Sequence, residues 1–401
     1  MEYDLVFEGG GAKGMAFVGA LQEFETRGHT HGRLLGTSAG AITATLLAAG
    51  YLSDEMLAAL NENLPDGKSV FTSFMASPGP FDQAAIKNSA IRTFLRAINL
   101  PLVPDFLEEK LDDAITEKLA EDPGFRHLFS FIERGGWYSA DNFLTWLQDK
   151  LNSGKFSGKR RKFGAMTMQQ FFEATKSELS LVASDTTGKQ MLVLNHTTAP
   201  KCPVAWAARM SMSIPLLWQE VIWQPEWGLY NNHDINGHAI VDGGLLSNFP
   251  IELFLSDLKD ITQVMGPKIS QEVLGFLIDE ETPVANAPET VVQTQTLNLA
   301  NLVTIQRLSR LVDTTLSARD KMVIDSYSNL VVRMPARDYG TTEFDMSAQR
   351  KTALIEAGKQ AMQAYYLAQE HPVAHDVSFG LDDEQTESQI IINRIASKIL
   401  R

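Results

Sequence analysis

The sequence predicts an α/β fold built around a mainly parallel sheet, and two observations support this prediction. The first fifty residues alternate twice between a short apolar strand and a helix, at 3–7, 12–28, 32–36 and 39–50. Strand-like segments then return in the second half of the chain, after a long helical stretch. Such alternation is typical of a parallel sheet, because each helix carries the chain back across the sheet to the next strand.

Each of the first four elements has its own signal. The segments YDLVF (3–7) and GRLLG (32–36) are short and apolar, as buried strands are. The helix between them ends at Gly28 and has apolar residues at helical spacing: Met15, Val18, Leu21 and Phe24. The helix after the second strand is rich in small residues and ends at Gly50.

Regular α/β signals return after residue 176. Strands are expected at 177–187, 190–198, 238–244, 273–279 and 329–335. A helix of small residues is expected around 204–213, a long amphipathic helix at 284–325, and a closing helix that begins at a capping residue, Ser347.

The chain is predicted to form one catalytic domain over residues 1–370, followed by a tail at 371–401. Residues 51–135 form a helical lid or insertion in which Pro- and Phe-bearing stretches separate helices. Its apolar side chains either face a hydrophobic substrate or pack on the domain: Phe71, Phe74, Met75 and Phe81. The apolar face of the tail either docks on the domain or contacts a partner or a membrane.

Charge and cysteine content exclude several classes of function. The formal net charge of −14 argues against a nucleic-acid partner, which requires a basic face. One basic cluster, at 155–162, is either a solvated loop or a patch that contacts lipid headgroups. The single cysteine, Cys202, excludes an internal disulfide and a Cys-rich metal site, and is expected to be buried.

The N-terminal sequence EYDLVFE is not a basic region followed by an apolar run, so no secretory signal is visible. The longest nearly apolar stretch, 39–52, is too short to span a bilayer. The prediction is a cytoplasmic protein with peripheral membrane contact, and export by a route independent of a signal peptide stays open.

A first glycine motif follows the first strand, with Gly9, Gly11 and Gly14 in the spacing G-x-G-x-x-G. A dinucleotide site would need an Asp or Glu at the end of the second strand, where Gly36 and Thr37 stand instead. A Walker loop is excluded because Lys13 is followed by glycine. The nucleotide interpretation is therefore weak.

A second motif, G-T-S-A-G, places Ser38 between an apolar strand and a helix. Gly36 and Gly40 let the backbones pass closely at such a sharp turn, which exposes a nucleophilic hydroxyl. The amides of Gly9, Gly10 and Gly11 end the adjacent strand at the same edge, so they can form an oxyanion hole. Lys13 either adds positive charge there or faces solvent.

The serine needs a base, and Asp242 is the best candidate. It ends a strand, and Gly243 and Gly244 allow close backbone approach beside the serine loop. Burial in an apolar cleft would raise its pKa toward the working range of a general base. A triad with histidine stays open, since five histidines flank Asp242 in the sequence: His196, His233, His238, His371 and His375.

Three ordered motifs, GGGAKG at 9–14, GTSAG at 36–40 and DGG at 242–244, resemble the patatin-like phospholipase family. The segments SDTTGKQMLVLNH and AARMSMSIPLLWQEV, with Ser213, also resemble blocks of that family. The resemblance implies a three-layer fold, with helices on both faces of the sheet.

The same resemblance implies a Ser38–Asp242 dyad without histidine and an oxyanion hole at Gly9–Gly11. The implied activity is cleavage of acyl esters of phospholipids or lysophospholipids through an acyl-enzyme, at a membrane or micelle surface and without metal or cofactor. A protein or small-ligand activator is a further expectation. The alternatives are a silent binding or scaffolding protein of the same fold and, less favoured, a nucleotide binder.

Overall fold

The computed structural model describes residues 1–97, 114–116, 118, 122–268, 270, 272–288, 327–370 and 381–399. The helix expected at 284–325 therefore lies, from residue 289 to its end, outside the described residues, and so do His371 and His375.

Within the described residues, eight strands form one sheet in the order β12-β11-β1-β2-β6-β10-β9, with β7 paired to β6. The strands are β1 (Glu2–Phe7), β2 (Thr30–Thr37), β6 (Leu179–Asp185), β7 (Gln190–Leu194), β9 (Val221–Ile222), β10 (Ala239–Asp242), β11 (Glu272–Pro283) and β12 (Val331–Arg337). Strands β12, β11, β1, β2 and β6 are parallel, whereas β7, β9 and β10 pair in antiparallel fashion. The predicted mainly parallel α/β sheet is confirmed.

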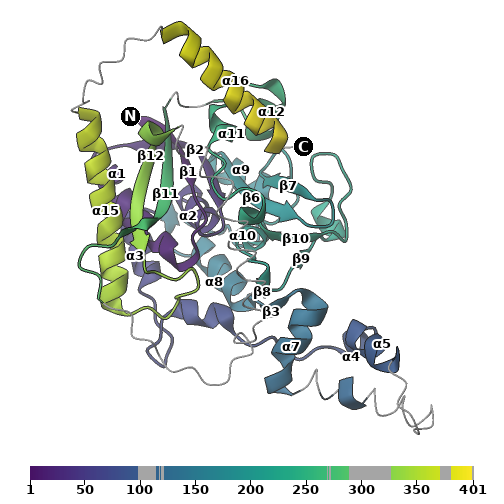
Figure 1. Ribbon diagram of the computed structural model, residues 1–401. Coiled ribbons are helices and arrows are strands. Elements are labelled where there is room, and N and C mark those ends of the chain that lie inside the picture. Colours follow the sequence, from purple (N-terminus) through teal and green to yellow (C-terminus); the bar gives the residue numbers. More distant parts are fainter. Residues whose placement is uncertain are drawn as a thin grey trace.

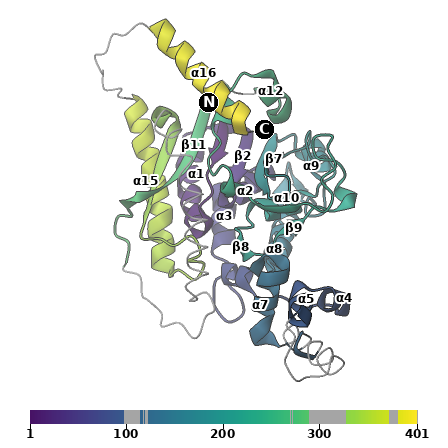
Figure 2. The ribbon, with the colours of Figure 1, turned by 45° about the vertical axis from the view of Figure 1, so that its right-hand side comes forward.

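Helices cover both faces of the sheet, so the fold has three layers (Figures 1 and 2). The larger core lies between the sheet and α1 (Ala16–Thr26), α2 (Ala39–Ala48), α10 (Val204–Ser211) and α15 (Ala348–Glu370). A second core lies under α11 (Glu252–Leu255), α12 (Lys259–Met265) and α16 (Leu381–Ile399). Alternate strand residues supply the two cores; Leu34 belongs to the first core and Leu35 to the second.

The remaining helices and short strands flank the sheet and its covering helices (Figure 1). They are α3 (Ser53–Leu60), α4 (Gln83–Lys87), α5 (Ala90–Ala97), α7 (Pro123–Arg134), α8 (Asp141–Leu151) and α9 (Met168–Thr175), with short strands β3 (Gly136–Tyr138), β4 (Lys155–Phe156), β5 (Lys159–Arg160) and β8 (Leu216–Trp218). The 3-10 turns are η1 (Gly11–Met15), η2 (Val70–Met75), η3 (Pro225–Trp227), η4 (Gly243–Leu245) and η6 (Ser328–Leu330).

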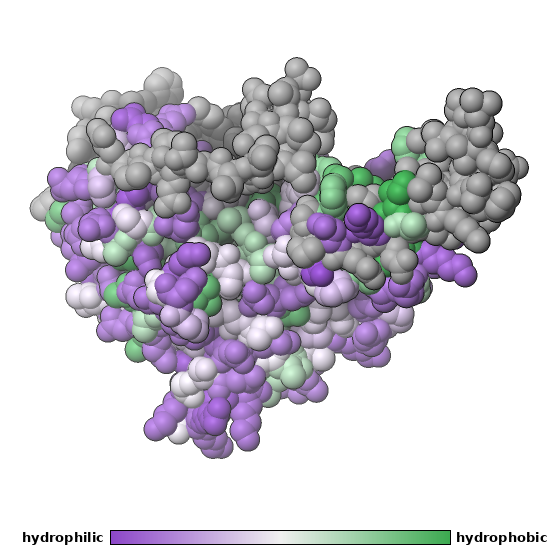
Figure 3. Space-filling model, turned by 90° about the horizontal axis from the view of Figure 1, so that it is seen from below, coloured by the Kyte–Doolittle hydropathy of each residue, from purple (hydrophilic) through white to green (hydrophobic). Residues whose placement is uncertain are grey.

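The described part of the insertion at 51–135 divides into two. Helix α3 and η2 pack on the main core, where Phe71 and Phe74 are buried. Helices α4, α5 and α7 form a projecting arm, whose small core joins Phe81 to Phe129. Apolar side chains gather on the arm in Figure 3, and three of them are exposed: Phe94, Phe125 and Ile132.

The tail contains α16, which packs on α11 and α12 and buries Ile392 and Ala396. The described tail residues therefore dock on the domain, which was one of the two alternatives. Ile390 and Ile391 of the same helix are exposed. Cys202 is buried, as predicted. None of the described helices combines the length and apolar character needed to cross a membrane.

Candidate active site

Ser38 occupies the sharp turn between β2 and α2. Its backbone angles are φ 53° and ψ −118°, a conformation that residues with a side chain rarely adopt. A Cβ at Gly40 would lie 2.3 Å from the carbonyl oxygen of Phe7, and a Cβ at Gly36 would lie 2.3 Å from that of Gly40. Both flanking glycines are thus required by close backbone contacts, as predicted for a nucleophile turn.

The pairing of β6 brings Asp242 beside this turn. Strand β7 pairs with residues 181–185 along one edge of β6, so β2 and β10 must share the other edge. On that edge Thr37 pairs with Val182, and Asp242 pairs with the next residue, Ala183. Because β10 is antiparallel to β6, its C-terminal end meets the C-terminal end of β2.

Strand alternation turns the Asp242 side chain toward the larger core. In β10, Ile240 belongs to that core, and Asp242 lies two residues further on. Ser38 lies one residue beyond β2, in the turn, and its hydroxyl interacts with the Asp242 carboxyl. A Cβ at Gly243 would lie 2.3 Å from the carbonyl oxygen of Val182, so only glycine fits next to the carboxylate.

Asp242 is a buried carboxylic acid, 2% exposed, and no ion pair is found for it among the described residues. Burial raises its pKa to about 7, while the Ser38 hydroxyl and the Gly244 N–H partly oppose this shift. The Gly244 N–H donates to Oδ1 at 2.8 Å. Within the described residues Oδ2 has no hydrogen bond of regular geometry, so the interaction with Ser38 is a loose one. This carboxyl can therefore change its protonation state near neutral pH.

The end of α10 and the residues directly after it hold the backbone of Ser38 and Asp242. The Ser38 N–H donates to Ser211 Oγ at 3.0 Å, and the Asp242 N–H donates to the Ser213 carbonyl at 2.9 Å. The buried Arg209 guanidinium contacts Ser213 Oγ, and burial lowers the pKa of Arg209 to about 10. Sequence reasoning placed Ser213 in a family block but assigned no role to Arg209 or Ser211.

The glycine loop lies against the serine. A Cβ at Gly9 would lie 3.0 Å from the Ser38 Cβ. The Gly9 N–H is already used, because it donates to the Asn248 carbonyl at 3.2 Å. The N–H groups of Gly10 and Gly11 have no acceptor among the described residues, and they are the amides left for a substrate oxygen.

Lys13 is buried behind this loop and forms an ion pair with Glu280. The alternative of a solvent-facing lysine is therefore wrong. The paired carboxylate also reduces the positive charge that Lys13 offers to the glycine loop.

An apolar cavity opens beside Ser38 and Gly11. The cavity has a volume of about 80 Å³. Its walls are mainly apolar and come from several elements: Ile42, Leu46, Met56, Phe74, Trp146 and Ile214. Phe71 and Phe74 pack on the main core and also line this cavity. Packing on the domain and facing a hydrophobic substrate are therefore compatible at these two positions.

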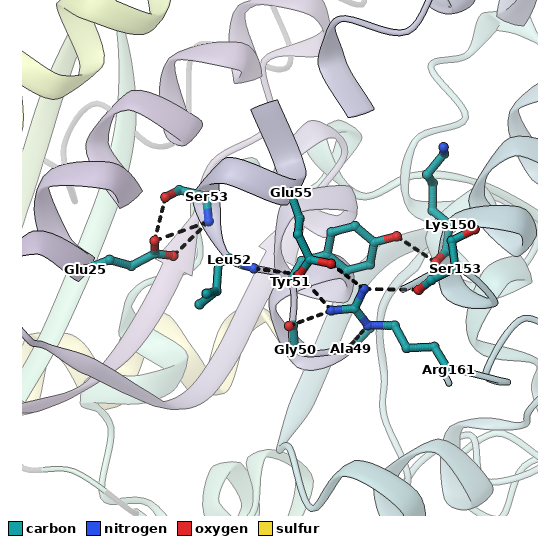
Figure 4. Close-up of polar contacts among 10 residues, drawn as sticks. All are labelled: Glu25, Ala49, Gly50, Tyr51, Leu52, Ser53, Glu55, Lys150, Ser153 and Arg161. Atoms are coloured by element: carbon teal, nitrogen blue, oxygen red, sulfur yellow. Dashed lines mark hydrogen bonds and ion pairs between the residues drawn. The ribbon is translucent and has the colours of Figure 1, made fainter. Parts of the chain in front are cut away.

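Helix α3, one wall of the cavity, is held by the polar contacts drawn in Figure 4. Glu25 accepts hydrogen bonds from the N–H and hydroxyl of Ser53, at the start of α3. Glu55 pairs with Arg161 at 2.9 Å, and the guanidinium also donates to the Gly50 carbonyl. Arg161 is thus buried, and neither interpretation of the basic cluster holds for it. Its neighbours are exposed, which both a solvated loop and a patch that contacts headgroups require: Lys155, Lys159, Arg160 and Lys162.

The described histidines do not join this site. His196 stacks on Phe172 and pairs with Glu178. His238 pairs with Asp185 at 2.8 Å, and no described histidine lines the cavity. Asp242 is therefore the carboxylate that lies beside Ser38, and no described imidazole joins them.

Comparison with known proteins shows the family of this chain. The model of the family "Patatin-like phospholipase" matches residues 5–255. The "Uncharacterized protein YqhO" of Bacillus subtilis is 29% identical over 91% of this chain and 98% of its own length. The "Probable lipid hydrolase 463L" of Invertebrate iridescent virus 6 is 22% identical over 62% of each chain.

Among solved structures, VipD from Legionella pneumophila matches with a TM-score of 0.44 and 16% identity, over 99% of this chain and 74% of VipD. The type III effector protein ExoU matches with a TM-score of 0.39 and 16% identity, over 100% of this chain and 61% of ExoU. The family model covers more than half of the chain and supports lipid hydrolysis in general. The chain belongs to the patatin-like phospholipase family.

Proposed function

We propose that the protein is a serine acyl hydrolase of the phospholipase A or lysophospholipase type, with Ser38 and Asp242 as its catalytic dyad. The observation that carries the proposal is the pairing of a strained serine with a buried carboxyl whose pKa is raised to about 7. The two lie beside an apolar cavity that can hold a fatty acyl chain. The substrates are phospholipids or lysophospholipids at a membrane or micelle surface.

In the first half of the reaction, Ser38 Oγ attacks the ester carbonyl carbon. Its proton moves to the Asp242 carboxylate, and the carbonyl π electrons move to oxygen, which becomes an oxyanion. The N–H groups of Gly10 and Gly11 stabilise this charge, aided by the N-terminus of α2. Collapse breaks the bond to the alcohol, which takes the proton from Asp242, and leaves an acyl-enzyme on Ser38.

In the second half, water attacks the acyl-enzyme carbonyl and gives its proton to Asp242. The tetrahedral intermediate uses the same two amides for its oxyanion. Its collapse expels Ser38 Oγ, which recovers the proton from Asp242, and releases the fatty acid. No step of this proposal calls for a metal or a cofactor, since one carboxyl carries the proton in both halves.

The test is hydrolysis of a panel of phospholipids, lysophospholipids and neutral lipids by the purified protein, with products identified by mass spectrometry. Each lipid is assayed with and without cell extract, because the proposal includes an activating protein or small ligand. We expect fatty acid release by the wild type and none by Ser38→Ala. A scaffolding protein of the same fold would release none under either condition.

A matched control is Ser270→Ala, which removes a buried serine near the opposite end of the sheet, where Ser270 donates to the Glu2 carbonyl. This variant should keep full hydrolysis and full labelling by a fluorophosphonate probe, whereas Ser38→Ala should lose both. Wild-type hydrolysis rates in purified Ser38→Ala would refute the proposed nucleophile.

A further inference from the structure

We infer that Asn248 is a positioning residue that sets the direction of the Gly10 N–H in the oxyanion hole. The inference deepens the proposed function and rests on it. Asn248 lies six residues after Asp242 and is not part of any motif singled out in the sequence. It is a positioning residue because it contacts Gly9 and Glu8 and does not line the cavity beside Ser38.

Asn248 holds Gly9 from both sides. The backbone carbonyl oxygen of Asn248 accepts the Gly9 N–H at 3.2 Å, and the side-chain Nδ2 of Asn248 donates to the Gly9 carbonyl at 2.9 Å. The same Nδ2 donates to Glu8 Oε1 at 3.2 Å. Glu8 Oε2 in turn accepts the N–H of Ile278 in β11 at 2.6 Å, which ties the arrangement to the central sheet.

The direction of the Gly10 N–H follows from peptide geometry. The Gly9 carbonyl and the Gly10 N–H belong to one planar peptide group, in which they point in opposite directions. A hydrogen bond that holds the Gly9 carbonyl toward Nδ2 therefore turns the Gly10 N–H away from Asn248. That N–H has no acceptor among the described residues, as a donor reserved for a substrate oxygen requires.

A run of three glycines needs such a clamp. Glycine adopts positive and negative φ with similar ease, so a peptide group between two glycines can rotate at little cost. The next peptide group is held separately, because the Gly10 carbonyl accepts the Lys13 N–H at 3.1 Å. The Gly9–Gly10 group has Asn248 Nδ2 as the side-chain donor on its carbonyl.

The clamp also explains why residue 9 is glycine. A Cβ there would lie 2.2 Å from Asn248 Oδ1, closer than to the Ser38 Cβ at 3.0 Å. Any side chain at residue 9 would push the Asn248 amide away from the loop. The glycine is thus required by its positioning partner at least as much as by the nucleophile.

The experiment compares Asn248→Ala and Asn248→Asp with the wild type. Asn248→Asp keeps the shape and Oδ1 but replaces the Nδ2 donor by an oxygen that repels the Gly9 carbonyl. We expect kcat to fall about 10- to 100-fold in both variants, while KM changes by no more than about threefold. The matched control is Asn195→Ala, which removes a buried amide whose Nδ2 donates to Ser180 Oγ and the Val264 carbonyl. It should lower the melting temperature but keep kcat.

Two inhibitors separate positioning from a general loss of structure. The first is a trifluoromethyl ketone with a fatty alkyl chain. Ser38 Oγ adds to its carbonyl carbon and an oxyanion forms, so the affinity of the Asn248 variants for this ketone should fall by the same factor as kcat/KM. A non-hydrolysable ether lipid forms no oxyanion and should bind all variants equally. A purely structural defect would weaken both.

Wild-type kcat and ketone affinity in either Asn248 variant would overturn the inference, and Asn248→Asp decides if the alanine variant does not fold. In that outcome the proposed function stands, provided that Ser38→Ala is inactive. If wild type and Ser38→Ala behave alike on every lipid, the proposed function fails first, and the two failures are thereby distinguished.

Discussion

Two buried carboxylates lie beside strand β2, one along its first half and one at its end, and they have opposite surroundings. Along the first half, Asp4 of β1 accepts the Arg33 backbone N–H and pairs with its guanidinium, all at 2.7 Å. At the end, Asp242 accepts one backbone N–H and interacts loosely with Ser38. No cation is paired with Asp242 among the described residues.

This difference shows that a buried carboxylate in this sheet can serve stability when it is paired with a cation, or reactivity when it is not. The Asp4 carboxylate is neutralised where it is buried, so its charge is tied to the fold. The Asp242 carboxyl is buried without a counter-ion, and its pKa therefore rises to about 7. A proton acceptor near neutral pH is obtained by leaving a buried acid unpaired, which lowers the stability of the folded chain.

The largest expected effect is on Asp242→Asn. Ester hydrolysis should fall by about 10³-fold or more, which is roughly 4 kcal/mol, because Ser38 loses its proton acceptor. Fatty acid release measured at saturating substrate tests this. Activity within tenfold of the wild type would show that another group is the base.

The same variant should be more stable than the wild type at pH 8. The pKa of Asp242 is raised from 3.8 to about 7 in the folded state, so the folded chain binds more protons and loses stability as pH rises between these values. The loss is on the order of 4 kcal/mol above pH 7. Urea unfolding should show a gain for Asp242→Asn that shrinks toward pH 4.

Substitution of Asp4, the other buried carboxylate beside β2, should have the opposite effect on stability. Asp4→Asn keeps an oxygen for the Arg33 N–H but leaves the guanidinium, 2% exposed, without its counter-charge. We expect the free energy of unfolding to fall by about 3–5 kcal/mol, with kcat per folded molecule unchanged. A lower kcat in the folded fraction would mean that the two carboxylates are coupled.

The pH profile sharpens the contrast. Since the protonated Asp242 cannot accept the Ser38 proton, kcat/KM should fall about tenfold per pH unit below its pKa of about 7 and reach a plateau above it. Stopped assays with a soluble short-chain ester, from pH 5 to 9, avoid changes in the lipid surface. A flat profile would contradict the role of Asp242.

The smallest effect is expected for Ser211→Ala. This change leaves the Ser38 backbone N–H without its side-chain acceptor. The Arg33 backbone N–H likewise donates to a side chain, that of Asp4. Stability should fall by about 1 kcal/mol, and kcat by only a few-fold, because the turn is also held by close glycine contacts. A loss as large as that of Ser38→Ala would make Ser211 part of the catalytic machinery.

Much of the fold was predictable because its signals are local. The strands at β1, β2, β6 and β11 are short apolar runs bounded by turn residues, and the GTSAG turn needs its glycines wherever a strand bends sharply into a helix. The family prediction is confirmed by the family model that matches residues 5–255. The roles of Ser38, Asp242 and the oxyanion amides remain predictions until they are tested.

Other features had no local signal. The sequence did not indicate that β10 runs antiparallel to β6, although this direction is what carries Asp242 to the end of β2. Arg161 looked like a member of a solvated basic loop, yet it is buried, because Glu55 and three backbone carbonyl groups accept its hydrogen bonds. Asn248 carried no motif, since its partners are brought to it only by folding.

The sequence by itself determined the strand and helix pattern, the strained serine turn and the acidic residue at a strand end, because neighbouring residues decide these features. Tertiary structure alone decided which groups meet: the shared edge of β6, the amide that holds Gly9 and the burial of Asp242 with no counter-ion among the described residues. The physical reason is that hydrogen-bond partners and burial, which set pKa and direction, come from segments far apart in the chain.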